Sequence, residues 1–362
     1  MTDETLTDFV ETVCGESRLR VEQDFGGGFV RLRSTEAEKR QAAQDIRCTE
    51  DIVIELLRNA RDAQAHSIFV ALQREEDRRS LVVIDDGCGI PASMRERIFE
   101  PRVTSKLDTA HMDKWGMHGR GMALYSISVN ATSAQVTYSQ PDGGSALAVS
   151  TDLSALKEKT DQSTFPRFEV VDGTYVMRGP RNIVRTCAEF ALEHRRDCTV
   201  YCGSFTEIAA TLYAYGMAAT TAAQRAFGGA RDDIPAVKLL AFATDPDDLA
   251  ARATQLGLVL SSRSARRIID GAIAPVPSLM ERLEQESFPK STSPSTPART
   301  AKPLADARGL KLVPEDAASL KAAAKSAFAD IAARYYLEPD VEPEVRATGE
   351  GIRIFIPANK LR

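Results

Sequence analysis

The sequence predicts a mixed α/β protein, and three observations carry that prediction. Residues 49–65 place apolar side chains on one face at about 100° per residue, the pattern of an amphipathic helix. Residues 67–72 and 80–85 are rich in aliphatic and β-branched residues, and the charged stretch 74–79 between them predicts a hairpin. Beyond about residue 160, helical and strand-like stretches alternate, which favours a small α/β domain with parallel strands.

Shorter elements follow the hairpin in the first half of the chain. A short helix is expected at residues 94–99, and another is expected to open after Gly121. Strands are expected at residues 134–138 and 145–150, because the proline and glycines of residues 141–144 between them favour a turn.

The second half continues with longer apolar stretches separated by polar ones. Capping residues and apolar periodicity define its elements. These are a helix at 181–195, a strand at 198–202, a helix at 206–215, a strand at 237–242, a helix at 246–256 capped by Asp245, a helix at 314–337 and a strand at 351–357.

Changes of composition divide the chain into four expected segments. Residues 287–304 are rich in proline, serine and threonine, which indicates a flexible linker. The segments are a first domain at 1–160, an α/β domain at 161–286, the linker at 287–312 and a C-terminal helix-plus-strand unit at 313–362.

Overall composition predicts a cytoplasmic protein. The 362 residues are 43% hydrophobic and 27% charged, as in ordinary globular proteins. The net charge of −5 gives no overall attraction to nucleic acid. The net charge does not exclude a local basic patch. No apolar run approaches the roughly 20 residues that span a bilayer, and the acidic start lacks the pattern of a signal peptide.

The six cysteines are scattered along the chain, and no pair has Cys-x-x-Cys spacing. Cys198 and Cys202 lack nearby residues that would complete a metal site. We therefore expect reduced thiols, with a metal cluster as the less favoured alternative.

The stretch Glu55-Leu-Leu-Arg-Asn59-Ala-Arg-Asp62 places an acid, an amide and a second acid on one stripe of the first helix. Spacings of four and three residues bring these side chains to neighbouring positions, at the border of the apolar face. An amide oxygen is a hard ligand that suits Mg²⁺, and a carboxylate one turn earlier can orient and deprotonate a water. For this helix alone, an exposed polar face is the alternative.

The stretch Asp85-Asp-Gly87-Cys-Gly89 follows the second strand of the hairpin. Glycines at alternate positions permit backbone torsions that other residues avoid, and they allow a flat ligand to approach closely. A buried aspartate at the end of a strand can accept a hydrogen bond from an exocyclic amine such as that of adenine. Taken alone, an Asp-Gly pair is also common in ordinary turns.

The third motif, Gly116-Met-His-Gly119-Arg-Gly121, precedes an apolar helix. Glycine amides at a helix N-terminus point toward anions and gain from the helix dipole, so this stretch is typical of a phosphate cradle. Lys106, after Thr104, is a candidate phosphate partner, with a solvated surface charge as the alternative.

A dinucleotide-binding fingerprint also contains three glycines, but it requires a strand directly before them. Residues 110–115 are not expected to form a strand, so we favour the phosphate cradle. All three motifs, in this order, fit a single ligand that combines a purine base, a magnesium ion and a triphosphate. ATP is therefore the predicted ligand.

At residues 45–152 the chain resembles the GHKL superfamily, which includes gyrase B, Hsp-ninety-type chaperones, sensor histidine kinases and MutL. Three of its motifs resemble, in order, the N box (Glu55, Asn59, Asp62, Ala63), the box that reads adenine (Asp85, Gly87, Gly89) and the glycine box beside the ATP lid (Gly116, Gly119, Gly121). Residues 98–101 and 104–106 resemble a stretch that histidine kinases carry between these boxes.

The resemblance implies a two-layer α/β sandwich of the Bergerat type, with ATP held between the helices and the lid. It also implies ATP and Mg²⁺ as cofactors, with Asn59 as the metal ligand and Glu55 as the general base. The nucleotide-contacting residues that it implies are Asn59, Asp62, Asp85, Gly87, Gly89, Ile90, Thr104, Lys106, Gly116, His118, Gly119, Arg120, Gly121 and Met122.

Three functions stay open within this resemblance. Glu55 is typical of the hydrolytic members, which favours a Mg²⁺-dependent ATPase that acts as a nucleotide-driven conformational switch. The Phe99-Glu-Pro stretch and the short segment 107–115 are more kinase-like, so transfer of the γ-phosphate to a histidine is the alternative. Residues 1–50 contain no histidine, and His194 is the candidate acceptor downstream. The third function is an ATP-binding module with negligible turnover.

The expected partners follow from these functions. Residues 161–362 are expected to bind a protein partner, and a homodimer stays open. A membrane is not expected as a partner, and the net charge does not support nucleic acid. A role on DNA would rest only on the fold-level analogy with MutL.

Overall fold

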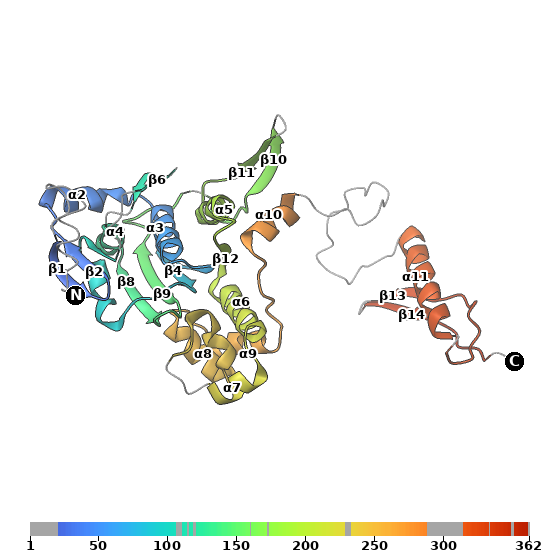
Figure 1. Cartoon of the computed structure of the whole chain (residues 1–362). Coiled ribbons are helices and arrows are strands. Elements are labelled where there is room, and N and C mark those ends of the chain that lie inside the picture. Colours follow the sequence, from blue (N-terminus) through green and yellow to red (C-terminus); the bar gives the residue numbers. More distant parts are fainter. Residues whose placement is uncertain are drawn as a thin grey trace. The chain divides into compact units, whose positions relative to one another are not determined.

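The computed structural model divides the chain into two compact units, Met1–Lys290 and Ser291–Arg362. Each unit has its own sheet and is described by itself (Figure 1). The structure describes residues 21–105, 111–113, 116–118, 121–159, 161–171, 174–228, 233–287, 314–332, 334–348 and 351–360.

A five-stranded mixed sheet forms the centre of the first unit (Figure 1). Its outermost strand at one edge pairs in parallel with its neighbour, and the other three pairings are antiparallel. The predicted hairpin of residues 67–85 is confirmed as the second and third strands. In spatial order the strands are β12 (Thr199–Ser204), β3 (Ser67–Glu75), β4 (Arg78–Asp85), β9 (Ser145–Asp152) and β8 (Ser133–Ser139).

Both faces of this sheet are buried. Successive side chains of a strand point to opposite faces of the sheet, so one apolar strand can contribute side chains to two hydrophobic cores. Val70 and Val83 lie in the core on one face, whereas Phe69, Val82 and Ile84 lie in the core on the other. This double burial explains why residues 68–72 of β3 and 81–84 of β4 are continuous apolar runs instead of alternating.

Helices on the first face include the long amphipathic helix that the sequence predicts. Its start is fixed by Asp51, whose carboxylate accepts hydrogen bonds from the backbone amides of Arg47 and Cys48. Its end is followed by Gln64, which adopts a positive φ of 61°. The helices on this face are α3 (Thr49–Asp62), α4 (Ala123–Asn130), α5 (Ile183–Glu193) and α10 (Leu279–Ser287), and α2 (Glu36–Asp45) packs against α4.

The second face is covered by elements from the later part of the first unit, so a third layer adds to the two-layer arrangement expected for residues 45–152. Residues 237–242, predicted as a strand, instead form a 3-10 helix after Pro235. That prediction is wrong because a short, fully apolar run does not distinguish a buried strand from a buried helical turn. The elements of this layer are α6 (Phe205–Ala218), α7 (Ala222–Gly228), η3 (Ala236–Phe242), α8 (Pro246–Gln255) and α9 (Ser262–Ile269).

The pairing of β12 with β3 differs from the domain boundary expected at residues 160/161. Thr199 pairs with Ser67, and the parallel register continues to Ser204 opposite Leu72. The strand predicted at 198–202 therefore belongs to the main sheet, and residues 161–290 fall in the same compact unit as the first domain. Among the described strands of this sheet, β12 and β3 are the one pair that runs parallel.

Smaller elements surround the sheet. The single helix expected at 94–99 is replaced by two 3-10 turns, since each closes after three residues. These elements are a sheet of β1 (Val21–Gly26), β2 (Phe29–Leu32) and β5 (Val103–Thr104), the hairpin β6 (His111–Asp113) with β7 (Gly116–His118), the hairpin β10 (Arg167–Val171) with β11 (Thr174–Arg178), and the turns η1 (Ala92–Met94) and η2 (Arg97–Phe99).

The described residues of the second unit form one helix and one antiparallel hairpin. Helix α11 (Pro314–Ala332) ends earlier than residue 337, and β13 (Glu344–Thr348) pairs with β14 (Gly351–Phe355), the predicted terminal strand. The expected linker lies outside the described residues, except for Ser287 at the end of α10.

None of the helices that the structure describes is long and apolar enough to cross a bilayer.

The turn before β9 requires a glycine for two separate reasons. Gly144 has a φ of +83°, and a Cβ atom there would overlap the carbonyl oxygen of Asp85. Gly28, in the turn between β1 and β2, has nearly the same φ of +84° but open space around it. A substitution at Gly28 therefore tests backbone strain alone, whereas one at Gly144 tests strain together with steric overlap.

We expect Gly144→Ala to lower the free energy of unfolding by more than about 3 kcal/mol, since it adds overlap with backbone to the strain of a positive φ. The matched variant Gly28→Ala carries the strain alone and should lose about 1 kcal/mol. Urea unfolding followed by circular dichroism measures both values. Equal losses in the two variants would contradict the close approach of Gly144 to β4.

Candidate functional site

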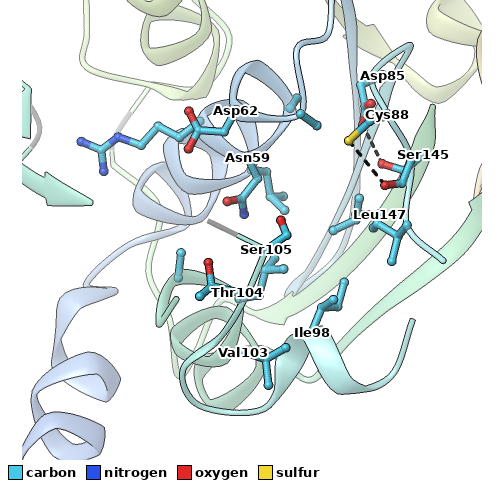
Figure 2. A pocket seen from close by; sticks show the side chains of 18 of the residues that line it. Asn59, Asp62, Asp85, Cys88, Ile98, Val103, Thr104, Ser105, Ser145 and Leu147 are labelled. Carbon is cyan, nitrogen blue, oxygen red and sulfur yellow. Dashed lines mark hydrogen bonds between the residues drawn. The ribbon is translucent and has the colours of Figure 1, made fainter. Parts of the chain in front are cut away.

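A cavity of about 400 Å³ opens on the first face of the sheet, between α3, the end of β4, β5 and the start of α4. This volume lies in the range of sites for small molecules, roughly 300–1,000 Å³. Figure 2 shows side chains from these elements converging on one space. The sequence-predicted residues that line it are Glu55, Asn59, Asp62, Asp85, Gly89, Ile90, Thr104 and Gly121.

Helix α3 contributes the polar wall of this cavity. The Nδ2 atom of Asn59 is buried and has no hydrogen-bond partner among the described residues. An unsatisfied buried amide is unfavourable, and it indicates room for a group that the protein itself does not supply. Rotation of this amide presents its oxygen, a ligand that suits Mg²⁺ when phosphates and water complete the shell. Asn59 therefore fits a metal–phosphate ligand.

Glu55 lies one turn before Asn59 and forms an ion pair with Arg58. The side chain of Arg58 is only 3% exposed, and that of Glu55 is 18% exposed. Both residues line the cavity, so a positive and a negative group sit together at its wall. The guanidinium of Arg58 thus fixes the position of the Glu55 carboxylate at the cavity wall.

Asp62 connects the cavity to the later part of the chain. Its Oδ1 atom accepts hydrogen bonds from Nε and Nη2 of Arg61, at 3.0 and 2.7 Å. The Nη1 atom of Arg61 lies 3.3 Å from Nε2 of His194, the residue that ends α5. His194, the candidate phosphate acceptor, is packed against the ring of Phe190, and its side chain is 14% exposed.

The Asp85 carboxylate closes the inner end of the cavity and is almost fully buried, at 2% exposed. Its Oδ1 accepts a hydrogen bond from the amide of Gly87 at 2.9 Å. Its Oδ2 accepts one from Oγ of Ser145 at 2.6 Å (Figure 2). Burial raises the pKa of Asp85 to about 6, although these two hydrogen bonds lower it. At neutral pH the carboxylate is ionised and has acceptor capacity left for a ligand.

The glycines after Asp85 are required by close packing. A Cβ atom on Gly87 would lie 2.6 Å from the carbonyl oxygen of Ala63, at the end of α3. Gly89 has a φ of +73°, and a Cβ atom there would overlap the carbonyl oxygen of Gln140. Gly89 lines the cavity, whereas Gly87 does not, so Gly87 acts by letting the turn pack against α3.

The third motif is only partly described. Gly121 has a φ of +68° and lines the cavity opposite Thr104, and Met122 is buried as the residue that precedes α4. Gly116 and His118 belong to the backbone of β7. Lys106, Gly119 and Arg120 lie outside the described residues.

One expectation about this motif is wrong. Residues 111–113, expected not to form a strand, are strand β6 and pair with β7. Such a short hairpin gives no local signal, because its pairing depends on the residues across the turn rather than on its own pattern. Since β6 pairs only with β7 among the described strands, and not with the main sheet, the strand–turn–helix unit of a dinucleotide site does not result.

Several lining residues were not predicted from the sequence. Ser145 and Leu147 of β9 lie opposite Asp85 and Val83 of β4 in the antiparallel register, so they face the same cavity. The strand around Ser145 was predicted, but its register with β4 was not, and that register is the signal that would have found both residues. Cys88, Ser105 and Phe29 also line the cavity.

The described cysteines, Cys48, Cys88, Cys187, Cys198 and Cys202, are all free thiols. Within the described residues, no group of three or more His, Cys, Asp or Glu side chains is arranged to hold a metal ion.

Comparison with known families matches this same part of the chain. Residues 44–155 match the family described as "Histidine kinase-, DNA gyrase B-, and HSP90-like ATPase". This segment is a GHKL-type ATPase domain. The GHKL domain implies ATP binding and an ATPase-type function, and its mixed sheet with helices packed against it agrees with the Bergerat fold.

Relatives of the GHKL domain belong to different kinds of protein. The DNA mismatch repair protein MutL of Anaplasma phagocytophilum (strain HZ) is 35% identical over 101 residues, 27% of this chain and 16% of that protein. MutL of Staphylococcus aureus (strain Newman) is 36% identical over 106 residues, 28% of this chain and 15% of that protein. The chain thus spans only about one sixth of the length of these relatives.

Among solved structures, the mycobacterial sensor histidine kinase MprB is 21% identical and covers 34% of this chain and 75% of that chain. The TM-score is 0.21, which is too low to establish a common overall fold.

We expect the stability of the protein to depend on the ionisation of Asp85. Because its pKa is about 6 when folded and about 3.9 in an unfolded chain, the folded state binds more protons between these values. The resulting stabilisation, about 3 kcal/mol, is present below about pH 4 and is lost as pH rises through about 6.

Urea unfolding of the wild type and of Asp85→Asn between about pH 4 and 8 tests this expectation. The wild-type free energy of unfolding, measured relative to that of the variant, should fall by about 3 kcal/mol across the window. If the difference in free energy of unfolding between the wild type and Asp85→Asn does not change with pH, the carboxyl group of Asp85 is not desolvated.

Proposed function

We propose that the protein is a Mg²⁺-dependent ATPase whose nucleotide state changes its conformation. The observation that carries this proposal is the meeting of Glu55, Asn59 and Asp85 in one cavity of the GHKL domain. These residues provide a base, a hard metal ligand and a buried acceptor for a purine amine at separate points of the wall. Such a set is what binding and hydrolysis of ATP require.

Asp85 is proposed to recognise adenine. Its carboxylate is held by Gly87 and Ser145, and it keeps acceptor capacity toward the cavity. Apolar residues of the cavity wall, such as Val83 and Leu147, suit the faces of a purine ring. Recognition of an exocyclic amine by a buried carboxylate also discriminates against guanine, which presents a carbonyl at that position.

Asn59 and Glu55 are proposed to act at the phosphate end. Asn59 would hold Mg²⁺ through its amide oxygen, consistent with the unpartnered amide in the cavity. When bound, the metal neutralises charge on the phosphates and favours the in-line attack of water. Glu55 would orient that water and accept its proton, and its ion pair with Arg58 positions the Glu55 carboxylate.

The conformational response is proposed to pass through α3. This helix carries four polar residues of the cavity wall, and α5 packs directly against it. The contacts of Arg61 with Asp62 and His194 connect the cavity wall to the end of α5. When nucleotide orders Asp62, the contact of Arg61 with His194 would shift the end of α5. Residues 161–362 are where we expect a protein partner or a second copy to bind. The free thiols of the described cysteines fit a cytoplasmic location.

We expect Glu55→Gln to lower the rate of phosphate release by about 100-fold or more while ATP still binds, because the base is lost and the size of the side chain is kept. Asp85→Asn should instead raise the Kd for ATP by about tenfold or more, since it removes a charged acceptor. Both are measured with Mg²⁺ and γ-labelled ATP, by following free phosphate and protein-bound label together.

Glu284→Gln serves as the control, because Glu284 is exposed on α10 and does not line the cavity. It should leave both quantities unchanged. Label that stays on the protein and resists base would identify a histidine kinase instead, with His194 the first position to test. Tight ATP binding with neither release nor label would identify a binding module.

We also expect Asn59→Ala to remove most of the gain in ATP affinity that Mg²⁺ provides, whereas Asn59→Asp should keep it, because a carboxylate remains a hard ligand. Titration of each variant with ATP in Mg²⁺ and in EDTA measures this gain. This gain in affinity should be smaller by about tenfold or more in Asn59→Ala than in the wild type. An unchanged gain in Asn59→Ala would remove Asn59 from the metal site.

A further inference from the structure

Helix α9 presents three arginines on one face, far from the ATP cavity in the fold. Arg263, Arg266 and Arg267 are all exposed, and spacings of three and four residues place them on the same side of the helix. Ala265 and Ile268 are buried on the other side, in the core of the second sheet face. The helix is therefore anchored by its apolar side and displays a basic side.

These arginines form no ion pair with any residue in the described part of the chain. By contrast, Arg252 of α8 pairs with Asp248, and Arg185 of α5 pairs with Glu189. The acid nearest along the chain to the α9 arginines is Asp270, the residue that ends the helix. Three unpaired guanidinium groups on two turns of helix form a local basic surface in a chain whose net charge is −5.

Helix α9 is the second member of a helix–turn–helix pair. Helix α8 ends at Gln255 with Leu256 as its C-cap, and Gly257 follows with a φ of +87°. Ser261 caps α9 by accepting a hydrogen bond from the amide of Ser264. Four residues therefore separate the two cap positions. Leu256 and Leu258 are fully buried, so the turn is fixed by the core.

A third helix supports this pair. Helices α8 and α9 pack against each other, and α6 packs against α9, as Figure 1 shows. Short helical pairs with a glycine in the turn, supported by another helix, are used to place the second helix in the major groove of DNA. Of the acids at the start of α8, Asp245 caps the helix and Asp248 pairs with Arg252, whereas Asp247 is exposed.

We propose that α9 binds duplex DNA, with the face of Arg263, Arg266 and Arg267 in the major groove. Arginine is suited to this role, because its planar group pairs with phosphates and with the edge of guanine through two hydrogen bonds. Hydroxyl groups of Ser262 and Ser264 in the first turn of α9 are suited to phosphate oxygens. Val259, 68% exposed in the turn, offers an apolar contact for a thymine methyl group.

This site is separate from the proposed ATPase. The cavity lies on the face of the sheet covered by α3, whereas α9 packs on the opposite face. The inference therefore does not require ATP hydrolysis, and loss of one activity need not remove the other.

The test is fluorescence anisotropy of the full chain with a labelled 24-base-pair DNA of mixed sequence, at several salt concentrations. The triple variant Arg263→Gln/Arg266→Gln/Arg267→Gln should raise the Kd by about tenfold or more. It should also reduce the slope of log K against log salt by about two to three, since each lost phosphate contact removes about 0.9. The control is Arg195→Gln/Arg196→Gln, which removes exposed arginines at the end of α5 and should change the Kd less than about twofold.

A duplex RNA of the same sequence should bind at least tenfold more weakly than the DNA, because the major groove of RNA is too narrow for a helix. Thermal unfolding and ATP binding of the triple variant confirm that it is folded. Equal loss of affinity in the control and triple variants would overturn the proposal, as would equal affinity for DNA and RNA. Binding that is absent for DNA but present for a polyglutamate peptide, and lost in the triple variant, would assign the surface to an acidic protein partner instead.

Discussion

The buried carboxylate of Asp85 is the interaction on which the arrangement of the cavity depends. It joins three segments, because it ends β4, accepts from the glycine turn at Gly87 and accepts from Ser145 at the start of β9. A charged group with so little exposure is tolerated only when its lone pairs are satisfied. The same requirement therefore closes the turn, fixes the strand register and leaves an acceptor at the inner end of the cavity.

A sheet that is buried on both faces allows the chain to carry two surfaces without interference. Helices α3 and α4 of the GHKL domain cover one face together with α5 and α10, and residues 205–269 cover the other. Because β3 and β4 contribute alternate side chains to both cores, a change of packing on one face is transmitted through rigid strands rather than through a flexible linker. If nucleotide binding affects the binding of a partner, β3 and β4 provide a short physical connection between the two faces.

Local patterns in the sequence predicted the hairpin of β3 and β4, the helix α3 and the polar stripe that it brings to the cavity. Each of these depends on spacing within a few residues, which a sequence displays directly. The pairing of β12 with β3 and the register of Ser145 opposite Asp85 were not predicted, because they join residues that are far apart along the chain. The run at 237–242 was misassigned for a different reason, since uniform burial removes the periodicity that separates helix from strand.

The parallel pairing of β12 with β3 has a consequence for synthesis of the chain. Ser67 leaves the ribosome about 130 residues before its partner Thr199, an interval of roughly 7 to 26 seconds at about 5–20 residues per second. Throughout that interval the outer edge of β3 is unpaired, and its residues Ile68–Ala71 are apolar. Such an edge invites pairing with other nascent chains. The nascent protein therefore has a defined period of aggregation risk, which ends when β12 emerges and covers the edge.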